Sequence, residues 1–317
     1  MGKYKNKIIF SIILAALVYV GFTIYADYTK LLVAFSEFKL WLIPVLLTLS
    51  LLNYFFRFLK WDYYLGVLKI NIDKRDSAGI FFSGFIMSIT PGKMGEVFKS
   101  FLLRELNNTP VSVSASIIFA ERVTDFLSLV MLSVTGAVIF GAGIELSILI
   151  LVLFIIMLLV LGNRKSSLFI LDKIDAITPF KRITPVLRNL YESSYTLLKV
   201  KPLVLMIFLS LFSWFFECFA YFLILKNYSL DLGLFWASFV YAFGTIIGAV
   251  TLLPGGLGIT EGSLTYFVVN AGASENVAVA STFIIRAVTL WFSVIVGIVA
   301  LSLYKKRISN INLNQLN

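Results

Sequence analysis

Apolar segments of near-membrane length alternate with short polar segments along most of the chain. The segments 8–26 and 145–162 both approach the ~20 apolar residues with which an α-helix crosses a bilayer. The short alternating strands of a membrane β-barrel are not evident. We therefore predict an all-α polytopic membrane protein with about six spanning helices. The expected spans are 8–26, 41–62, 111–140, 145–162, 203–225 and 277–303.

Two further apolar regions, 78–106 and 233–271, are interrupted near their middle. The interrupting residues are Pro91, Gly92 and Gly95 in the first region and Pro254, Gly255 and Gly258 in the second. Proline removes a backbone donor and stops a helix, whereas glycine permits positive φ. Because irregular backbone at membrane depth is tolerated only inside protein or beside water, the breaks indicate two re-entrant elements around a polar cavity. A pair of packing kinks is the alternative.

The two halves of the chain resemble each other at a nearly constant spacing. Residues 53–57 parallel 213–217 at an offset of 160, the two breaks are offset by 163, and Arg122 and Arg286 by 164. Each half therefore consists of a span, a broken element and a span. We predict repeats at 41–140 and 203–303 within a single membrane domain, 1–317. Repeats with interrupted helices recur in transporters.

The basic residues predict how the chain is oriented. If both interrupted regions return to the side from which they entered, nineteen Lys and Arg lie on one side of the membrane and three on the other. Basic loops stay in the cytoplasm, so both termini and the basic connector 163–201 are expected there, in the plasma membrane. The first break is then entered from the cytoplasm and the second from outside, which makes the repeat inverted.

Composition argues against several kinds of chemistry. The chain is 59% hydrophobic and 14% charged, contains no His, and has a single Cys, Cys218, within an apolar run. No metal site and no cofactor are expected, and Cys218 is interpreted as a packing residue. The net charge of +10 is explained by the cytoplasmic loops, so no nucleic-acid partner is expected. These features favour transport over catalysis.

Ionisable residues beside the breaks are candidates for function, because charge at membrane depth is costly. Lys93 and Glu96 follow the first break, and Glu261 follows the second. A half-helix N-terminus beside a lysine would suit an anion such as a lipid phosphate. The alternative is that these side chains only extend to the interface.

A second group of charges lies within the long apolar stretches. Glu121 and Asp125 share a helical face, and Arg122 is within reach of Asp125. Arg286 has no local acid, and its candidate partners are Glu217 and Glu261. Ion pairs that lock the two halves together and direct contact with a substrate are both open. The predicted substrate-binding residues are Lys93, Glu96, Arg122, Glu261 and Arg286, and the ion-pair candidates are Glu121, Asp125 and Glu217.

Other charged and aromatic residues are interpreted as structural. Arg57, Lys60 and Trp61 are the basic and aromatic anchors expected where a span meets the interface. Lys99 is within pairing reach of the glutamate three residues before it, but we expect Lys99 and Arg104 to extend to the membrane surface.

These motifs resemble the lysylphosphatidylglycerol synthase transmembrane-region family, whose members are often called flippase-like. The resemblance rests on residues 90–96 with Lys99, on Glu121 and Arg122 with Asp125, and on 253–262, and it covers roughly 8–303. It implies movement of a phospholipid or an isoprenoid-linked lipid between leaflets. In bifunctional members a soluble aminoacyltransferase domain follows the membrane region. No such domain is expected on this chain, which leaves a separately encoded aminoacyltransferase or glycosyltransferase open as a partner.

The favoured function is a lipid translocase that moves an anionic or lipid-linked phosphate headgroup between leaflets. The lipid is open and includes a polyprenyl-phosphate-linked sugar. Two alternatives remain. One is a membrane-embedded transferase acting on a lipid-linked sugar, with Glu or Asp as its base. The other is a non-catalytic membrane subunit of a lipid-modifying enzyme.

Overall fold

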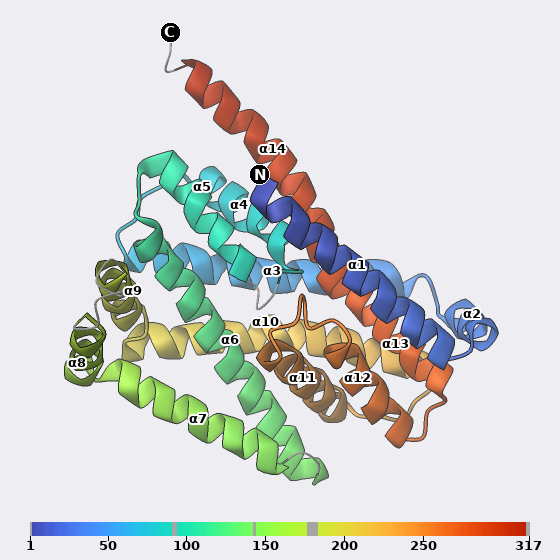
Figure 1. Ribbon diagram of the computed structural model, residues 1–317. Coiled ribbons are helices and arrows are strands. Elements are labelled where there is room, and N and C mark those ends of the chain that lie inside the picture. The colour runs from blue at the N-terminus through green and yellow to red at the C-terminus, as the bar shows by residue number, and fades with distance from the viewer. Residues whose placement is uncertain (1, 91–93, 142–143, 176–182, 315–317) are drawn as a thin grey trace.

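The computed structural model describes residues 2–90, 94–141, 144–175 and 183–314, and within these ranges the chain forms helices and no strand (Figure 1). The first half contains α1 (Gly2–Tyr25), α2 (Tyr28–Glu37), α3 (Leu42–Val67), α4 (Lys74–Ser83), η1 (Gly84–Met87), η2 (Met94–Val97), α5 (Phe98–Asn107) and α6 (Val111–Phe140). The middle contains α7 (Ile144–Gly162), α8 (Arg164–Asp175) and α9 (Thr184–Leu197). The second half contains α10 (Val200–Asn227), α11 (Leu234–Val250), α12 (Ile259–Asn270), α13 (Glu275–Arg286), the π-helical turn η4 (Ala287–Trp291) and α14 (Phe292–Asn314). The all-α prediction is confirmed.

Between four and six helical units of the described chain can span a membrane. α3, α6, α10 and the continuous segment Glu275–Tyr304 are long and apolar enough by themselves. Two bent pairs qualify if each is counted as one span: Ile13–Tyr25 with Tyr28–Glu37, bent by 95°, and Ser147–Gly162 with Arg164–Lys173, bent by 84°. The protein is therefore an integral, polytopic membrane protein, with helices at the six predicted positions.

Three segments differ from the predicted layout. Residues 27–39, expected as a polar loop, contain α2, because the Asp27 carboxylate caps its first turn by accepting the Thr29 backbone N–H at 3.0 Å. α3 continues to Val67, one and a half turns beyond its predicted end at residue 62. The connector 163–201 contains α8 and α9, and α9 packs along α6. The cytoplasmic location of this connector stays a prediction.

Both interrupted regions turn back on themselves. α4 packs against α5, and α11 packs against α12, so each region forms a helical hairpin (Figure 1). In the connection between α11 and α12, Gly255, Gly256 and Gly258 have φ values of 60°, 68° and 84°. Only glycine adopts this conformation without strain. The predicted break is therefore present, and three glycines produce it.

The two halves of the chain interlock. α6 packs on α11 of the second hairpin, while α14 packs on α4 and η1 of the first. Glycines allow these close approaches: a Cβ on Gly136 of α6 would lie 2.2 Å from Cβ of Phe239, and one on Gly297 of α14 would lie 2.2 Å from the Ile86 backbone nitrogen. Each long helix thus covers the broken element of the opposite half.

α3 and α10 lie side by side through the centre of the molecule (Figure 1). Asn53 Nδ2 donates to the Ser213 carbonyl at 2.9 Å, and Ser213 Oγ donates to the Asn53 carbonyl at 3.3 Å. The Phe56 and Phe216 rings lie 5.6 Å apart. Both pairs join positions that the sequence repeat aligns. Such reciprocal contacts are expected where a two-fold axis passes between equivalent elements.

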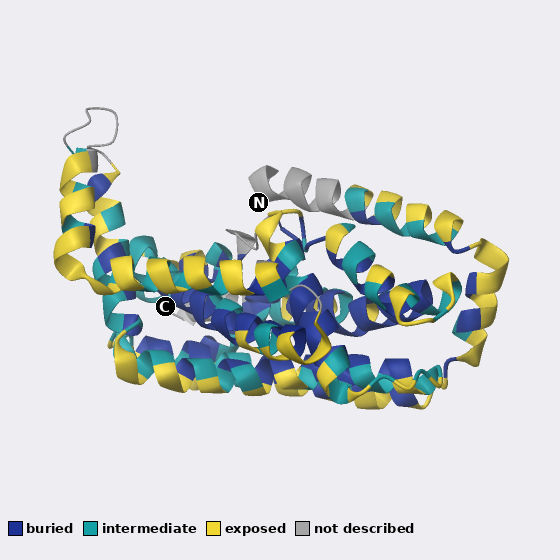
Figure 2. Cartoon of the chain, turned by 90° about the horizontal axis from the view of Figure 1, so that it is seen from below, coloured by how far each residue is buried: buried dark blue, intermediate teal, exposed yellow. Residues whose placement is uncertain are grey.

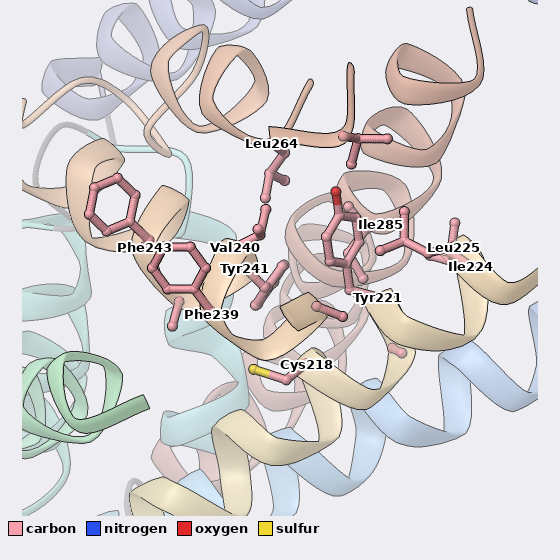
Figure 3. Packing of buried hydrophobic residues seen from close by; sticks show 14 of the residues in the cluster. Cys218, Tyr221, Ile224, Leu225, Phe239, Val240, Tyr241, Phe243, Leu264 and Ile285 are labelled. Carbon is pink, nitrogen blue, oxygen red and sulfur yellow. The ribbon is translucent and has the colours of Figure 1, made fainter. Parts of the chain in front are cut away.

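Buried residues concentrate where the helices face one another, and exposed residues lie on the outer faces (Figure 2). The core between α10, α11, α12 and α13 includes Cys218, which is fully buried beside Tyr221 and Phe239 (Figure 3). Its interpretation as a packing residue is confirmed. The outer face of α7 exposes large apolar side chains, including Leu153 and Leu159, which suits contact with lipid.

Candidate functional site

A cavity of about 240 Å³ lies between α6, α10, α11 and the second break. Its polar lining comes from Arg122 and Asp125 of α6, Trp214 of α10, Thr245 of α11, Thr260 of α12 and Arg286 of α13. The rest of the lining is apolar or glycine. Ala249 and Leu253 line the cavity and are also exposed, so the cavity reaches the molecular surface at this edge.

Glycines bring the walls of the cavity together. A Cβ on Gly248 would lie 2.0 Å from Thr260 Oγ1, so only glycine lets α11 approach the start of α12 this closely. A Cβ on Gly255 would lie 3.7 Å from Cα of Ile89, which immediately precedes the first break. Ile89 and Leu257 also belong to one buried cluster. The two broken regions therefore meet beside the cavity.

Arg122 lies between two carboxylates that already have other cations. Its Nη2 lies 3.2 Å from Glu96 and 3.2 Å from Asp125. Glu96 also lies 3.6 Å from Arg57, and Asp125 also pairs with Lys60. The Arg122 side chain is 28% exposed, and its Nε and Nη2 make no hydrogen bond to the described residues. Arg122 therefore borders the cavity with its Nη2 between two carboxylates and its Nε without a hydrogen-bond partner, and its predicted pairing with Asp125 is confirmed.

The structure corrects three structural interpretations. Lys60 and Trp61, expected as interfacial anchors, are almost completely buried, and Lys60 pairs with Asp125. Lys99, expected at the membrane surface, is also buried and donates to Glu121 at 2.7 Å. The physical reason is that α3 continues well beyond its predicted end, and that acids on α6 neutralise both lysines. The suggested pair between Lys99 and Glu96 is replaced by the pair with Glu121. Arg57, the third expected anchor, is also mostly buried and lies 3.6 Å from Glu96. Arg104 is exposed near the end of α5.

Arg286 is held by the second break. Its Nε donates to Glu261 at 2.7 Å, and its Nη2 donates to the Gly255 carbonyl at 2.5 Å. The other Glu261 oxygen accepts the Gly258 backbone N–H at 2.7 Å. Of the two candidate partners for Arg286, Glu261 is therefore the one in contact. The start of α12 is capped by this glutamate and is not open to a substrate anion.

The remaining predicted residues fall into three groups. Pro91, Gly92 and Lys93 lie outside the described residues. Gly95 belongs to η2, and Pro254 is buried in the second break. Glu217 accepts a hydrogen bond from Tyr241 Oη at 2.6 Å on the α10–α11 contact.

Trp214 is a cavity residue that was not among the predicted site residues. In the sequence it is one of many aromatic residues in an apolar span, so no local pattern indicates that it lines a cavity. The one available signal is its alignment with Tyr54 in the repeat, and this signal does not indicate a cavity.

The cavity combines guanidinium groups and an indole with an apolar wall and an opening to the surface. Arginine is suited to oxyanions because it offers several N–H donors in a fixed plane. The apolar wall suits a ligand that carries hydrocarbon. The arrangement is therefore complementary to an amphipathic molecule with an oxyanion at its head.

The model of the lysylphosphatidylglycerol synthase transmembrane region matches residues 8–297. The chain belongs to this family. A UPF0104 membrane protein of Methanocaldococcus jannaschii is 26% identical over 232 residues, which cover 71% of this chain and 96% of that protein. A UPF0104 membrane protein of Methanothermobacter thermautotrophicus is 25% identical over 276 residues, which cover 79% of this chain and 82% of that protein. The part matched to the lysylphosphatidylglycerol synthase transmembrane region includes every residue that lines the cavity.

Proposed function

We propose that this protein is a lipid translocase, which moves a lipid with an anionic phosphate headgroup between the leaflets of the cell membrane. The observation that supports this most is the cavity at the contact of the two broken regions, lined by Arg122 and Arg286 and open to the surface at Ala249 and Leu253. A headgroup in this cavity would leave its hydrocarbon chains in the membrane.

The physical problem for such a protein is the cost of removing charge from water. Moving an isolated ionised group into an apolar medium costs tens of kcal/mol by simple solvation estimates. Arg122 and the neighbouring polar groups would replace part of the lost hydration, because guanidinium groups and an indole line the cavity. The barrier falls to the extent that these donors satisfy the headgroup during the crossing.

We further propose that the two halves, 41–140 and 203–303, are inverted repeats with both termini in the cytoplasm. The reciprocal contacts of Asn53 with Ser213 and of Phe56 with Phe216 support a two-fold relation. The excess of basic residues on one side supports the orientation. In transporters with this design, movement of one repeat against the other exposes a central site to each side in turn.

The proposal is tested by plugging the cavity without changing any charge. Ala249 lines the cavity and is exposed, whereas its neighbour Val250 is 60% exposed and does not line it. The protein is reconstituted in proteoliposomes containing fluorescent phosphatidylglycerol, and lipid movement is followed by dithionite quenching. Ala249→Trp is expected to slow the movement at least fivefold, while the matched control Val250→Trp leaves it unchanged.

Two outcomes would contradict this function. If wild-type protein and empty liposomes move phosphatidylglycerol and a polyprenyl-phosphate probe equally slowly, the purified chain is not a translocase of these lipids, and a subunit role is favoured. If extraction and chromatography recover a chemically altered lipid, the chain is a membrane-embedded transferase.

A further inference from the structure

Trp214 brings an unsatisfied donor to the cavity. Its side chain is 5% exposed and lines the cavity, yet its indole N–H has no hydrogen-bond partner among the described residues. Burial of a donor without a partner is unfavourable, so buried polar groups are nearly always paired. An unpaired N–H beside a cavity is explained if a ligand supplies the acceptor.

The repeat-related residue provides an internal comparison. Tyr54 aligns with Trp214, is also buried, and donates its hydroxyl to the Thr289 carbonyl at 2.8 Å. At one of two equivalent positions the protein therefore supplies the acceptor itself. At the other, the donor borders a space that also contains Arg122.

Arg122 and Trp214 differ from Arg286 in how many of their N–H donors already have partners. Arg286 uses two of its nitrogens on Glu261 and on the Gly255 carbonyl. Arg122 Nη2 lies within ion-pair distance of Glu96 and Asp125, whereas its Nε has no hydrogen-bond partner among the described residues. The cavity is thus lined by a guanidinium on α6 whose Nε is unpaired and by an indole on α10 whose N–H is unpaired among the described residues.

We infer that Arg122 and Trp214 together bind one phosphodiester oxyanion of a lipid headgroup, with Trp214 acting as a neutral hydrogen-bond donor. This inference rests on the proposed function and names the ligand chemistry of its site. Guanidinium supplies the charge, and the indole N–H selects an acceptor oxygen. A phosphocholine headgroup is expected to bind less tightly, because it has no net charge whereas phosphatidylglycerol is a net anion, and the cavity lining contains two arginines and one aspartate.

The inference is tested by equilibrium binding to the full chain in neutral detergent, measured by isothermal titration calorimetry. The probes are dihexanoyl phosphatidylglycerol, dihexanoyl phosphatidylcholine and soluble glycerophosphoglycerol. We expect phosphatidylglycerol to bind about tenfold more tightly than phosphatidylcholine. Binding of glycerophosphoglycerol at an affinity within a few-fold of phosphatidylglycerol would identify a phosphate site that does not use the lipid chains. Much weaker binding would identify a lipid site, and both results support an oxyanion site.

The decisive variant is Trp214→Phe, which keeps a ring and removes the N–H. It is expected to weaken phosphatidylglycerol binding about tenfold, the size expected for a hydrogen bond to a charged acceptor. The matched control is Trp61→Phe, because Trp61 also has an unpaired buried indole N–H but does not line the cavity. It is expected to leave binding unchanged. If Trp214→Phe does not fold, Arg122→Lys is used, which keeps the charge, removes the planar donor group and is expected to weaken binding similarly.

Equal binding of phosphatidylglycerol by Trp214→Phe and wild type would overturn the inference. So would tighter binding of phosphatidylcholine than of phosphatidylglycerol. Neither result would contradict lipid translocation, which is measured separately through Ala249→Trp. Conversely, tight, Trp214-dependent binding without any lipid movement would retain the oxyanion site and reject the transport function.

Discussion

Arg122 and Arg286 stand 164 residues apart, at positions that the proposed repeat aligns, yet the two surroundings differ. Arg286 is held by Glu261 and by a backbone carbonyl of the break, so its charge and two of its nitrogens are committed. Arg122 lines the cavity, shares its carboxylates with Arg57 and Lys60, and has an Nε without a hydrogen-bond partner among the described residues. The comparison separates an arginine that is held by the second break from an arginine whose carboxylates also have other cations. Variants at Glu261 and Arg122 test this difference, and a variant at Lys99 adds a buried ion pair outside the cavity for comparison.

Glu261→Ala is expected to have the largest effect on stability. It removes the partner of Arg286 and the cap of Gly258 together, and a buried cation left without its partner costs about 3–5 kcal/mol. Thermal unfolding of the purified protein in detergent should show a large loss or no folded protein. Glu192→Ala is the control, because Glu192 forms only an exposed pair with Arg164, and it should unfold as wild type does. Wild-type stability in Glu261→Ala would mean that Arg286 is not held as described.

Lys99→Met is expected to lower the stability less than Glu261→Ala does, and a second substitution should restore most of the loss. Lys99 pairs with Glu121 away from the cavity, and breaking this buried pair should cost about 3 kcal/mol. Replacing both partners, in Lys99→Met with Glu121→Leu, should recover most of the stability, because a well-packed apolar pair can substitute for a buried ion pair. Denaturant unfolding of the two single variants and the double variant measures the coupling. A double variant with no lipid movement would instead assign this pair a functional role.

Arg122→Gln is expected to be the least destabilising of the three, by about 1 kcal/mol, because Glu96 and Asp125 keep Arg57 and Lys60. Lipid movement in proteoliposomes should nevertheless fall at least tenfold, since the variant loses the charged donor of the cavity. Arg286→Gln serves as the comparison. It should lower the thermal stability more than Arg122→Gln does, but lower the rate of lipid movement per folded molecule less. The opposite ranking would exchange the roles of the two arginines.

The sequence was sufficient to predict the features that depend on local pattern. Span positions follow from apolar length, the second break follows from its glycines, and the pairing of Arg122 with Asp125 follows from helical spacing. Glu261 as a partner of Arg286 was one of two options, and only the fold of the second hairpin decides between them.

Features that depend on tertiary packing were missed. Lys60 and Lys99 resemble interfacial anchors because each stands near the end of an apolar run, but their burial depends on acids of α6 that are distant in sequence. The position of Trp214 beside a cavity depends on how several helices pack together. The spacing of residues within one segment does not show which distant helices will pack around it.

The interlocked packing of the two halves also has a consequence for biosynthesis. α6 covers the hairpin of α11, and α14 covers the hairpin of α4 and η1, so each half depends on the other for closure. When the ribosome has released only the first half into the membrane, the first hairpin still lacks the helix that will cover it. Final assembly therefore has to wait until α14 has been synthesised, and a chain stopped after α9 would expose both unfinished surfaces to quality control.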